Sequence, residues 1–508
     1  MSVAVINSRA QSGIAAPMVS VEAHLSNGVP AFSIVGLPET VVRESRDRVR
    51  GALLNSHFEF PARRIIVNLA PADLPKEGGR FDLPIALGIL AASGQLDQQL
   101  LQQYEFAGEL ALTGELRAIK GSLLFALGTR SSGRSLIVPR ANAKEAALAQ
   151  EVTIYAADHL LEVCAHLNQR LALLPVQQQD ALSTPSSALH GDMCDVRGQA
   201  HARRALEIAA AGGHSLLFMG PPGTGKTMLA SRLPSILPPM TEDEALEVAA
   251  IASISQQGFD YKLWRQRPFR APHHTASGIA LVGGGSTPKP GEISLAHHGV
   301  LFLDELPEFN RRTLEMLREP LESRKITISR ATKQAEFPAS FQLVAAMNPC
   351  PCGHLSDPRH ACRCTLEQIQ RYRARISGPL LDRIDMHVEV PALSSGFLMR
   401  DDQQARPESS AAIVARVEAA RERQYQRAGM ANHLLPSALI ESTCPLTKVA
   451  QLFMESAMEK LGLSARAYHR VLKVARTIAD IDNEADIRHE HLTEALAYRR
   501  LDRRQIPV

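Results

Sequence analysis

The sequence predicts an α/β protein with two successive α/β regions and a smaller all-α region after them. The chain of 508 residues is long enough for about three domains. Apolar strand-like runs alternate with helical ones up to about residue 391, and only helical periodicity follows. Hydrophobic residues make up 45% of the chain and charged residues 21%, so sizeable cores can be buried and broad disorder is excluded.

The first region covers residues 1–172. Residues 64–69 and 135–139 are short apolar runs typical of strands, whereas residues 84–92 have the composition of a helix. Residues 173–190 are rich in Gln, Ser, Thr and Pro and predict a linker. We therefore expect a separate α/β domain before this linker.

The second region, residues 191–391, opens with a predicted helix over 198–211 and a short strand over 216–219. The next eight residues fit the phosphate-loop pattern G-x-x-x-x-G-K-[ST]. They are Gly220, Pro221, Pro222, Gly223, Thr224, Gly225, Lys226 and Thr227. Glycines let the backbone turn its N–H groups toward a polyphosphate, and the following helix N-terminus adds favourable potential. Lys226 supplies a charge for the β/γ-phosphates, and the Thr227 hydroxyl can ligate Mg²⁺.

Two further predicted strands of this region end in polar residues. Residues 300–303 are apolar and are followed by Asp304 and Glu305, and residues 341–347 are followed by Asn348. At the carboxyl edge of a parallel sheet Asp304 can hold Mg²⁺, and Glu305 can orient and deprotonate the attacking water. Asn348 can position that water or contact the γ-phosphate; its alternative role is to form a turn before a proline.

Charge and hydropathy exclude several classes of protein. The chain has 56 Lys and Arg residues against 53 Asp and Glu, which excludes a strongly basic coat but not a local basic lining. It has no run of about 18 apolar residues and no secretory signal pattern at its start. We therefore expect a cytoplasmic protein without a membrane span.

The motifs together resemble those of an AAA+ ATPase, and more narrowly those of magnesium-chelatase motor subunits and MCM helicases. The sequence is most similar to the bacterial ComM/YifB family of magnesium-chelatase-like proteins. The specific marks lie in residues 270–277, 291–299, 348–353 and 380–385. The resemblance implies a cytoplasmic hexameric motor that uses ATP and Mg²⁺. It also implies branch migration of DNA during homologous recombination in natural transformation.

The resemblance also implies roles for two arginines. Arg383 matches an arginine finger that would be given to the γ-phosphate of a neighbouring subunit and would neutralise the developing charge there. Without the family context, its neighbours Asp382 and Asp385 favour an ordinary salt bridge. Arg466, in the all-α lid over residues 392–508, matches the second sensor position. Arg470 and Arg476 are weaker candidates.

A basic segment separates the strands of the second region. Residues 313–319 predict a short helix that Pro320 should end or kink, and residues 325–338 predict a β-hairpin. Seven basic residues face three acidic ones over residues 311–334. The resemblance implies that this hairpin projects into the pore of a ring, where Lys333 and, from another loop, Lys289 could contact single-stranded or branched DNA. Such contacts would follow the DNA backbone without reading sequence. The alternative is a solvated hairpin.

Four cysteines lie within residues 349–365 and form the pattern C-x-C, nine residues, C-x-C. They are Cys350, Cys352, Cys362 and Cys364. Four thiolates can close a tetrahedral Zn²⁺ site, and we expect zinc in preference to free thiols or disulfides. For the adjacent histidine pairs we favour structural or nucleic-acid-contact roles over metal binding. These pairs are His273, His274, His297 and His298.

The N-terminal region resembles the proteolytic domain of Lon, which implies a ribosomal S5 domain 2-like fold. Where Lon needs a serine nucleophile this chain has Arg80, and where Lon needs a lysine base it has Leu123. Neither can perform that chemistry, so we expect the fold without the protease. Ser122 and Lys120 nearby keep the alternative open.

The leading hypothesis is an ATP-driven homo-hexameric motor that translocates on DNA, with recombination proteins as candidate partners. The first rival is a chelatase-like or protein-remodelling AAA+ ATPase without DNA activity. The others are a Lon-like ATP-dependent protease and a nucleotide-gated assembly module.

Overall fold

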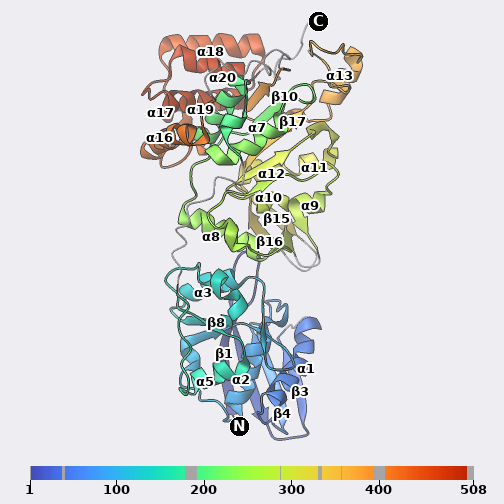
Figure 1. The fold of residues 1–508 in the computed structure, drawn as a ribbon, viewed down its shortest axis with the longest axis vertical. Coiled ribbons are helices and arrows are strands. Elements are labelled where there is room, and N and C mark those ends of the chain that lie inside the picture. Colours follow the sequence, from blue (N-terminus) through green and yellow to red (C-terminus); the bar gives the residue numbers. More distant parts are fainter. Residues whose placement is uncertain are drawn as a thin grey trace. The chain divides into compact units, whose positions relative to one another are not determined.

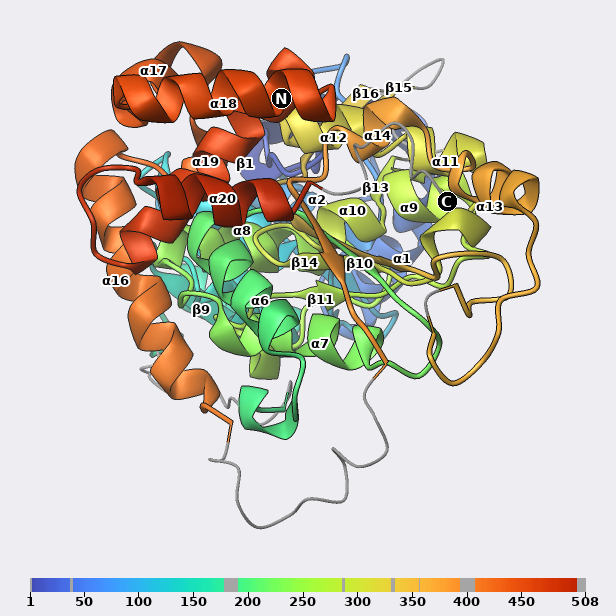
Figure 2. The same cartoon turned by 90° about the horizontal axis from the view of Figure 1, so that it is seen from above.

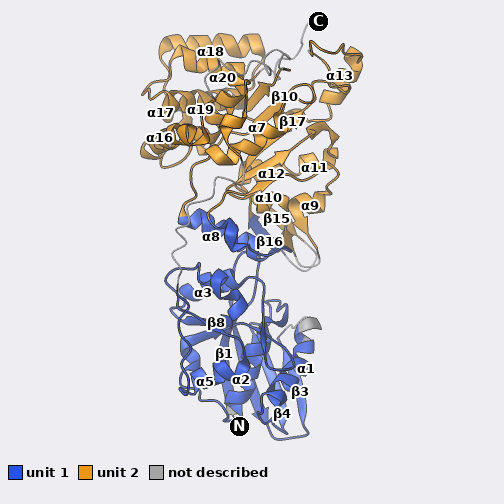
Figure 3. Ribbon diagram, viewed as in Figure 1, with its two compact units in different colours: residues 1–184, 242–264, 331–337 blue, residues 185–241, 265–330, 338–508 orange. Residues whose placement is uncertain are grey.

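The computed structural model describes residues 2–36, 40–177, 191–285, 288–329, 334–355, 357–392 and 407–499. The chain forms two compact units, coloured separately in Figure 3. Unit 1 consists of residues 1–184, 242–264 and 331–337. Unit 2 consists of residues 185–241, 265–330 and 338–508. Residues 242–264, from the middle of the second sequence region, therefore pack with the N-terminal residues.

Unit 1 is built on a seven-stranded mixed sheet (Figure 1). Its strands lie side by side in the order β3 (Ala31–Val35), β4 (Arg64–Ala70), β2 (Met18–Ser26), β1 (Ser2–Arg9), β5 (Tyr104–Phe106), β8 (Ser135–Pro139) and β9 (Ile154–Ala157). The pairs β1–β2 and β2–β4 are antiparallel, and the other neighbouring pairs are parallel. Alternate side chains of β2 and β4 are buried, because successive residues of a strand point to opposite faces.

Helix α2 (Asp82–Ala92) forms the centre of unit 1. All of its residues are buried, and it packs against β1 and β2. This confirms the helix predicted over residues 84–92, and its lack of a polar face is typical of a core helix. The other elements of the unit are α1 (Thr40–Asn55), α3 (Ser122–Arg130), α4 (Ala143–Ala146), α5 (Leu160–Leu167), α8 (Glu242–Ser253) and the short strands β6 (Glu109–Leu110) and β7 (Leu116–Arg117).

Unit 2 contains a five-stranded parallel sheet. The strand order is β11 (Phe269–Arg270), β14 (Val300–Leu303), β17 (Gln342–Met347), β10 (Leu216–Met219) and β18 (Met386–Glu389). All neighbouring pairs are parallel, and β10, β14 and β17 are buried along their whole lengths. The predicted strands over 216–219, 300–303 and 341–347 are thus confirmed, and their carboxyl ends meet at one edge of the sheet.

One helix precedes the first of these strands, and short helices connect the others. They are α6 (Ala200–Gly212), α7 (Lys226–Arg232), α9 (Gly278–Val282), α10 (Glu292–Leu295), α11 (Arg311–Glu315), α12 (Arg318–Ser323), α13 (Leu366–Arg373) and α14 (Gly378–Leu381). The single helix expected over 313–319 is wrong, because two helices share that segment. Pro320 does not end a helix either. It is the third residue of α12, in the first turn, where a missing backbone N–H costs little.

Two small two-stranded sheets lie outside the parallel sheet. One joins β12 (Gly283–Gly284) to β13 (Lys289–Pro290), and the other joins β15 (Lys325–Ser329) to β16 (Gln334–Pro338). The second confirms the predicted hairpin strands. Lys289 is exposed on β13, whereas Lys333 lies outside the described residues.

The C-terminal part of unit 2 is helical, as the sequence predicted. It consists of α16 (Ser410–Ala428), α17 (Ser437–Thr443), α18 (Lys448–Leu461), α19 (Ala465–Ile481) and α20 (His489–Ala497). Figure 2 shows these helices, orange to red, gathered beside α6, and α16 and α19 pack directly against that helix. No helix in the described ranges is both long and apolar enough to cross a membrane.

Candidate functional site

The phosphate-loop residues form a turn between β10 and α7. Gly223 and Gly225 have φ values of 72° and 86°, in the left-handed region that glycine adopts without a steric penalty. Gly220 packs against the next strand, where an added Cβ would lie 2.1 Å from the carbonyl oxygen of Val390. The Thr224 hydroxyl donates to the carbonyl of Pro221 across the turn, at 3.0 Å. The positive φ values and the close contact of Gly220 explain why glycines are needed in this turn.

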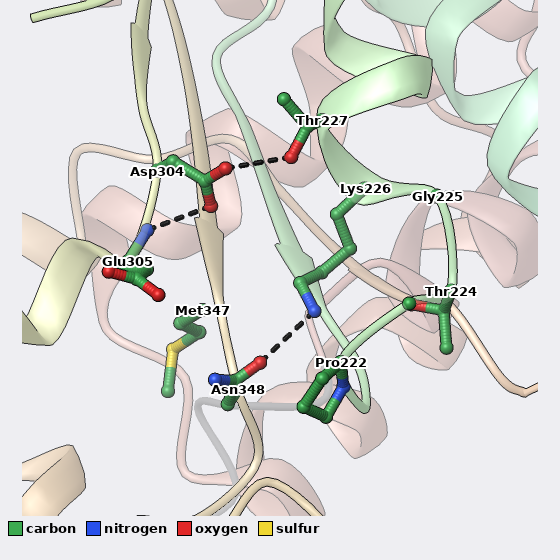
Figure 4. Close-up of a pocket in the computed structure, with 10 residues that line it drawn as sticks. Pro222, Thr224, Gly225, Lys226, Thr227, Asp304, Glu305, Met347 and Asn348 are labelled. Atoms are coloured by element: carbon green, nitrogen blue, oxygen red, sulfur yellow. Dashed lines mark hydrogen bonds between the residues drawn. The ribbon is translucent and has the colours of Figure 1, made fainter. Parts of the chain in front are cut away.

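A cavity of about 400 Å³ lies in front of this turn (Figure 4). Its lining comes from the turn and from the carboxyl ends of β14 and β17: Pro222, Gly223, Thr224, Gly225, Lys226, Thr227, Asp304, Glu305, Met347 and Asn348. The structure therefore brings together most of the candidates taken from the phosphate loop and from both strand ends. Gly220 and Pro221 are not in this lining and instead offer their carbonyls to Lys226.

Lys226 is held at the centre of the site. Its Nζ donates to the carbonyl oxygens of Gly220 and Pro221, at 2.7 and 2.9 Å, and to Oδ1 of Asn348 at 3.1 Å. Burial lowers the pKa of Lys226, whereas the charges of Asp304 and Glu305 act in the opposite direction. A buried ammonium whose partners are neutral oxygens can turn to a triphosphate, because charged oxygens are stronger acceptors.

Asp304 and Thr227 provide oxygen atoms suited to a divalent cation. The Thr227 hydroxyl donates to Oδ2 of Asp304 at 2.7 Å, and the backbone N–H of Glu305 donates to Oδ1 at 2.9 Å. Mg²⁺ prefers oxygen ligands and usually keeps several waters. A carboxylate and a hydroxyl that already meet beside the phosphate loop fit that preference.

Glu305 has an unusual backbone conformation. Its φ is 51°, which is uncommon for a residue other than glycine and is a form of strain found at functional sites. Its side chain is 54% exposed, and its Oε2 lies 3.2 Å from Nδ1 of His274. The carboxylate thus stands at the mouth of the cavity with a histidine beside it.

The arginines predicted to contact phosphate lie elsewhere. Neither Arg383 nor Arg466 is among the described residues that line the cavity. Both instead bind Oε1 of Glu322, at 2.8 and 3.1 Å. Arg383 is 7% exposed and Arg466 51%. In one protomer these two side chains therefore form a cluster that is separate from the nucleotide cavity.

The two weaker arginine candidates serve the packing of the helical part. Arg470 forms an ion pair with buried Asp385. Arg476 is buried, pairs with Asp480 at 3.1 Å, and donates to the carbonyls of residues 484 and 485. These contacts within the chain give both arginines a structural role that needs no ligand.

The four cysteines of residues 349–365 converge. Sγ of Cys350 lies 3.4 Å from that of Cys352 and 3.7 Å from that of Cys362, and the last two are 3.6 Å apart. Cys364 completes the group, whose sulfurs all lie within 4.8 Å of one another. A tetrahedral Zn²⁺ with Zn–S bonds of about 2.3 Å needs sulfur separations of about 3.8 Å. The donor set therefore fits zinc, and these separations are far too long for disulfides.

Electrostatics favour a metal ligand at one of these thiols. Hydrogen bonds from the backbone N–H groups of His354 and Arg363 lower the pKa of Cys352 to about 6. The same loop touches the nucleotide site. A Cβ added at Gly353 would lie 2.8 Å from the ring of Pro222, and the guanidinium of Arg373 donates to the carbonyl of Pro349 at 3.2 Å.

In unit 1 the residues at the positions of the Lon nucleophile and base have structural contacts. Arg80 is buried, its guanidinium carbon lies 5.0 Å from the ring centre of Phe125, and burial lowers its pKa to about 10. Leu123 is part of the core. Lys120 donates to the carbonyls of Ser255 and Gln256, and the buried Ser122 hydroxyl has no hydrogen-bond partner among the described residues. The alternative pair of Ser122 and Lys120 is therefore not joined by a hydrogen bond.

Two residues that the structure places here are not predicted from the sequence to lie at these sites: the sequence favours a structural or nucleic-acid-contact role for His274, and it does not single out Glu322. His274 follows β11, a parallel neighbour of β14, so its position at the carboxyl edge could have been inferred from the strand order. Glu322 carries no sequence signal, because only the folded chain brings it to Arg383 and Arg466.

Three family models match the chain. "Magnesium chelatase, subunit ChlI" matches residues 192–398, "Subunit ChlI of Mg-chelatase" matches residues 21–142, and "Magnesium chelatase, subunit ChlI C-terminal" matches residues 407–499. Together these matches extend over most of both units.

Curated relatives give the same result along the whole chain. The competence protein ComM of Haemophilus influenzae is 54% identical over 505 residues, which cover 99% of this chain and 98% of the relative. The uncharacterized protein YifB of Escherichia coli is 52% identical over 503 residues, with the same coverage. Lon protease 2 of Bacillus subtilis is 26% identical over 179 residues, which cover 31% of this chain and 32% of the relative, so the similarity to Lon is weak.

Proposed function

Because this chain belongs to the ComM/YifB family of magnesium-chelatase-like AAA+ proteins, we propose that it is an ATPase whose subunits form a ring and move DNA. The observation that carries the proposal is the convergence of Lys226, Thr227, Asp304, Glu305 and Asn348 on one cavity. These are the side chains that triphosphate hydrolysis requires: a phosphate-binding cation, a metal-binding pair, a base and a polar sensor.

In this proposal the phosphate loop binds the β- and γ-phosphates of ATP, with Lys226 and the backbone N–H groups as donors. Thr227 and Asp304 would hold Mg²⁺, which would neutralise charge on the phosphates when bound. Glu305 orients the attacking water and accepts its proton. Asn348 senses the γ-phosphate, which displaces its amide oxygen from Lys226.

Hydrolysis then requires a second protomer. Arg383 and Arg466 lie outside the cavity of their own chain, and we propose that both act on the nucleotide of a neighbour. Head-to-tail contacts of this kind close into a ring when the rotation permits. A homo-hexamer is the ring that we propose.

The substrate that we propose is single-stranded or branched DNA. Lys289, exposed on β13, and Lys333 of the basic hairpin supply cations that would bind phosphates regardless of sequence. One relative is named a competence protein, which supports a role in natural transformation. We propose branch migration of recombination intermediates in the cytoplasm, with recombination proteins as partners.

We further propose a structural Zn²⁺ at Cys350, Cys352, Cys362 and Cys364. The sulfur separations of 3.4–3.7 Å support this assignment. A closed site of four thiolates leaves no open position for catalysis, so the metal would rigidify the loop that packs on the phosphate loop.

The domains that we propose are residues 1–172, 191–391 and 392–508, joined by a linker over 173–190. The first would have the Lon-type fold without peptidase activity. Arg80 and Leu123 cannot act as nucleophile and base, and the Ser122 hydroxyl and Lys120 are not hydrogen-bonded to each other.

The test is ATP hydrolysis by the purified chain with and without single-stranded DNA or a synthetic four-way junction. We expect DNA to stimulate hydrolysis and ATP to drive resolution of the junction, and Lys226→Ala to abolish both. Hydrolysis that DNA leaves unchanged would favour a chelatase-like or protein-remodelling ATPase. Degradation of casein would favour a protease. Junction resolution by the Lys226→Ala variant would reject an ATP-driven motor.

A further inference from the structure

Glu322 binds two arginines that come from separate parts of unit 2. Its Oε1 lies 2.8 Å from Nη2 of Arg383 and 3.1 Å from Nη2 of Arg466. Glu322 belongs to α12, Arg383 follows α14, and Arg466 is the second residue of α19. A single carboxylate oxygen therefore draws together cations from the ATPase core and from the helical part.

The two arginines are held to different degrees. Arg383 is 7% exposed, and its Nη1 also donates to the carbonyl of Pro379 at 2.6 Å. Its buried Nε has no partner in the described part of the chain. Arg466 is 51% exposed. A cation as buried as Arg383 needs a counter-charge, and a half-exposed arginine keeps many conformations unless a partner restrains it.

Two guanidinium groups on the same oxygen would repel each other without that oxygen. Neutralising Glu322 would leave Arg383 with the Pro379 carbonyl, a neutral hydrogen-bond acceptor. It would also remove the ionic contact that holds Arg466 beside Arg383. The carboxylate thus sets both the charge balance and the geometry of the cluster. Glu322 is itself 46% exposed, so its pair with Arg466 adds little to stability, and its effect on Arg466 is on the position of that side chain.

We propose that Glu322 is a positioning residue for ATP hydrolysis, which gathers Arg383 and Arg466 into one two-cation cluster for the triphosphate of a neighbouring protomer. The inference rests on the proposed function, in which both arginines act across the ring. A cluster assembled in advance does not have to be organised while charge develops on the phosphoryl group, and this preorganisation lowers the barrier.

The first test is the Glu322→Gln variant of the full chain. We expect its kcat for ATP to fall about tenfold or more, whereas its KM and its nucleotide affinity change less than about twofold, because the cluster acts mainly on charge that develops in the transition state. Glu322→Asp keeps the charge and should recover part of the rate. Glu319→Gln is the matched control, because Glu319 is an exposed residue of the same helix.

The second test uses mixed rings. Glu322→Gln subunits keep an intact cavity, and Glu305→Gln subunits keep an intact arginine cluster. Random mixing in equal amounts should place both intact halves together at about a quarter of the sites. The ATPase rate of the mixture should therefore exceed the average of the rates of the two variants measured alone. A defect confined to folding would not be rescued in this way.

The outcomes separate the two proposals. A wild-type chain without ATPase activity defeats the proposed function itself. If the wild-type chain hydrolyses ATP, then unchanged or faster hydrolysis by Glu322→Gln overturns the inference alone. A slow Glu322→Gln variant that Glu305→Gln subunits do not rescue also overturns it, because Glu322 would then act within its own chain.

Discussion

The Thr227 hydroxyl donates a hydrogen bond of 2.7 Å to the carboxylate of Asp304, and this bond joins the phosphate loop to the end of β14. The two residues are 77 positions apart in the sequence. Their oxygens already lie together, so both side chains are in place to hold a divalent cation, which prefers oxygen ligands.

Replacing Thr227 by Val removes the hydroxyl and keeps the shape of the side chain. We expect the Mg²⁺ concentration for half-maximal ATP hydrolysis to rise about tenfold, because one oxygen ligand is lost. Titration of the ATPase rate with Mg²⁺ measures this shift. Thr227→Ser, which retains the hydroxyl, should behave like the wild type. An unchanged Mg²⁺ requirement in Thr227→Val would contradict the assignment.

His274 should affect the rate of hydrolysis more than the binding of ATP. Its Nδ1 lies 3.2 Å from Glu305, whose left-handed backbone conformation needs support from its surroundings. We expect His274→Ala to lower kcat by roughly fivefold with little change in KM, since a partly exposed pair contributes up to about 1 kcal/mol. His273→Ala is the matched control, because Nδ1 of His273 pairs with the Thr275 hydroxyl instead. Equal effects of the two variants would rule out a specific role for His274.

Substitution of Cys352 provides the test for zinc. We expect one zinc per wild-type chain by elemental analysis, and loss of that metal in Cys352→Ser. The melting temperature should fall by about 5 °C or more, since metal affinity contributes directly to folding. Nucleotide affinity should also fall, because Gly353 of the same loop packs on Pro222. Cys194→Ser, at an exposed cysteine outside the cluster, is the control. If the wild-type chain is purified without a chelator and elemental analysis finds no zinc in it, the proposed site is refuted.

The stability of unit 2 should depend on pH through Lys473. Burial lowers the pKa of Lys473 to about 8 from its ordinary value of 10.5, and its Nζ donates to the carbonyl of His433. Between these two values the unfolded chain binds more protons than the folded one, so the contribution of Lys473 to stability rises as pH increases.

Lys473→Met lacks this titration. We expect the free energy of unfolding of the wild type to gain about 1–3 kcal/mol relative to the variant between pH 8 and pH 10.5. Urea unfolding of both proteins across this range measures the difference between their free energies of unfolding. The contributions of groups that titrate in both proteins cancel in this difference. A constant difference would show that the lysine keeps its ordinary pKa in the folded chain.

The elements around the nucleotide cavity could be predicted because their residues determine them locally. Four consecutive apolar residues define β10 and β14, and the spacing of glycines and Lys226 defines the turn between β10 and α7. The parallel order of the strands then brings Asp304, Glu305 and Asn348 to the same edge.

Long-range packing could not be predicted in this way. Nothing in the sequence of α8 indicates that it packs on α3 of unit 1, because its composition suits any amphipathic helix. Glu322 looks like an ordinary surface acid until the fold brings Arg383 and Arg466 to it. Such meetings depend on the tertiary path of the chain, which local periodicity does not encode.

Arg383 and Arg466 lie outside the cavity of their own chain, and this position has a consequence for how ATP hydrolysis would depend on protein concentration. If both arginines act on the nucleotide of an adjacent copy, a single chain can bind ATP but cannot hydrolyse it. Turnover per molecule would then rise steeply with concentration and vanish on dilution. The cell would need no inhibitor to keep newly made chains inactive, because a monomer would lack the arginines that hydrolysis requires.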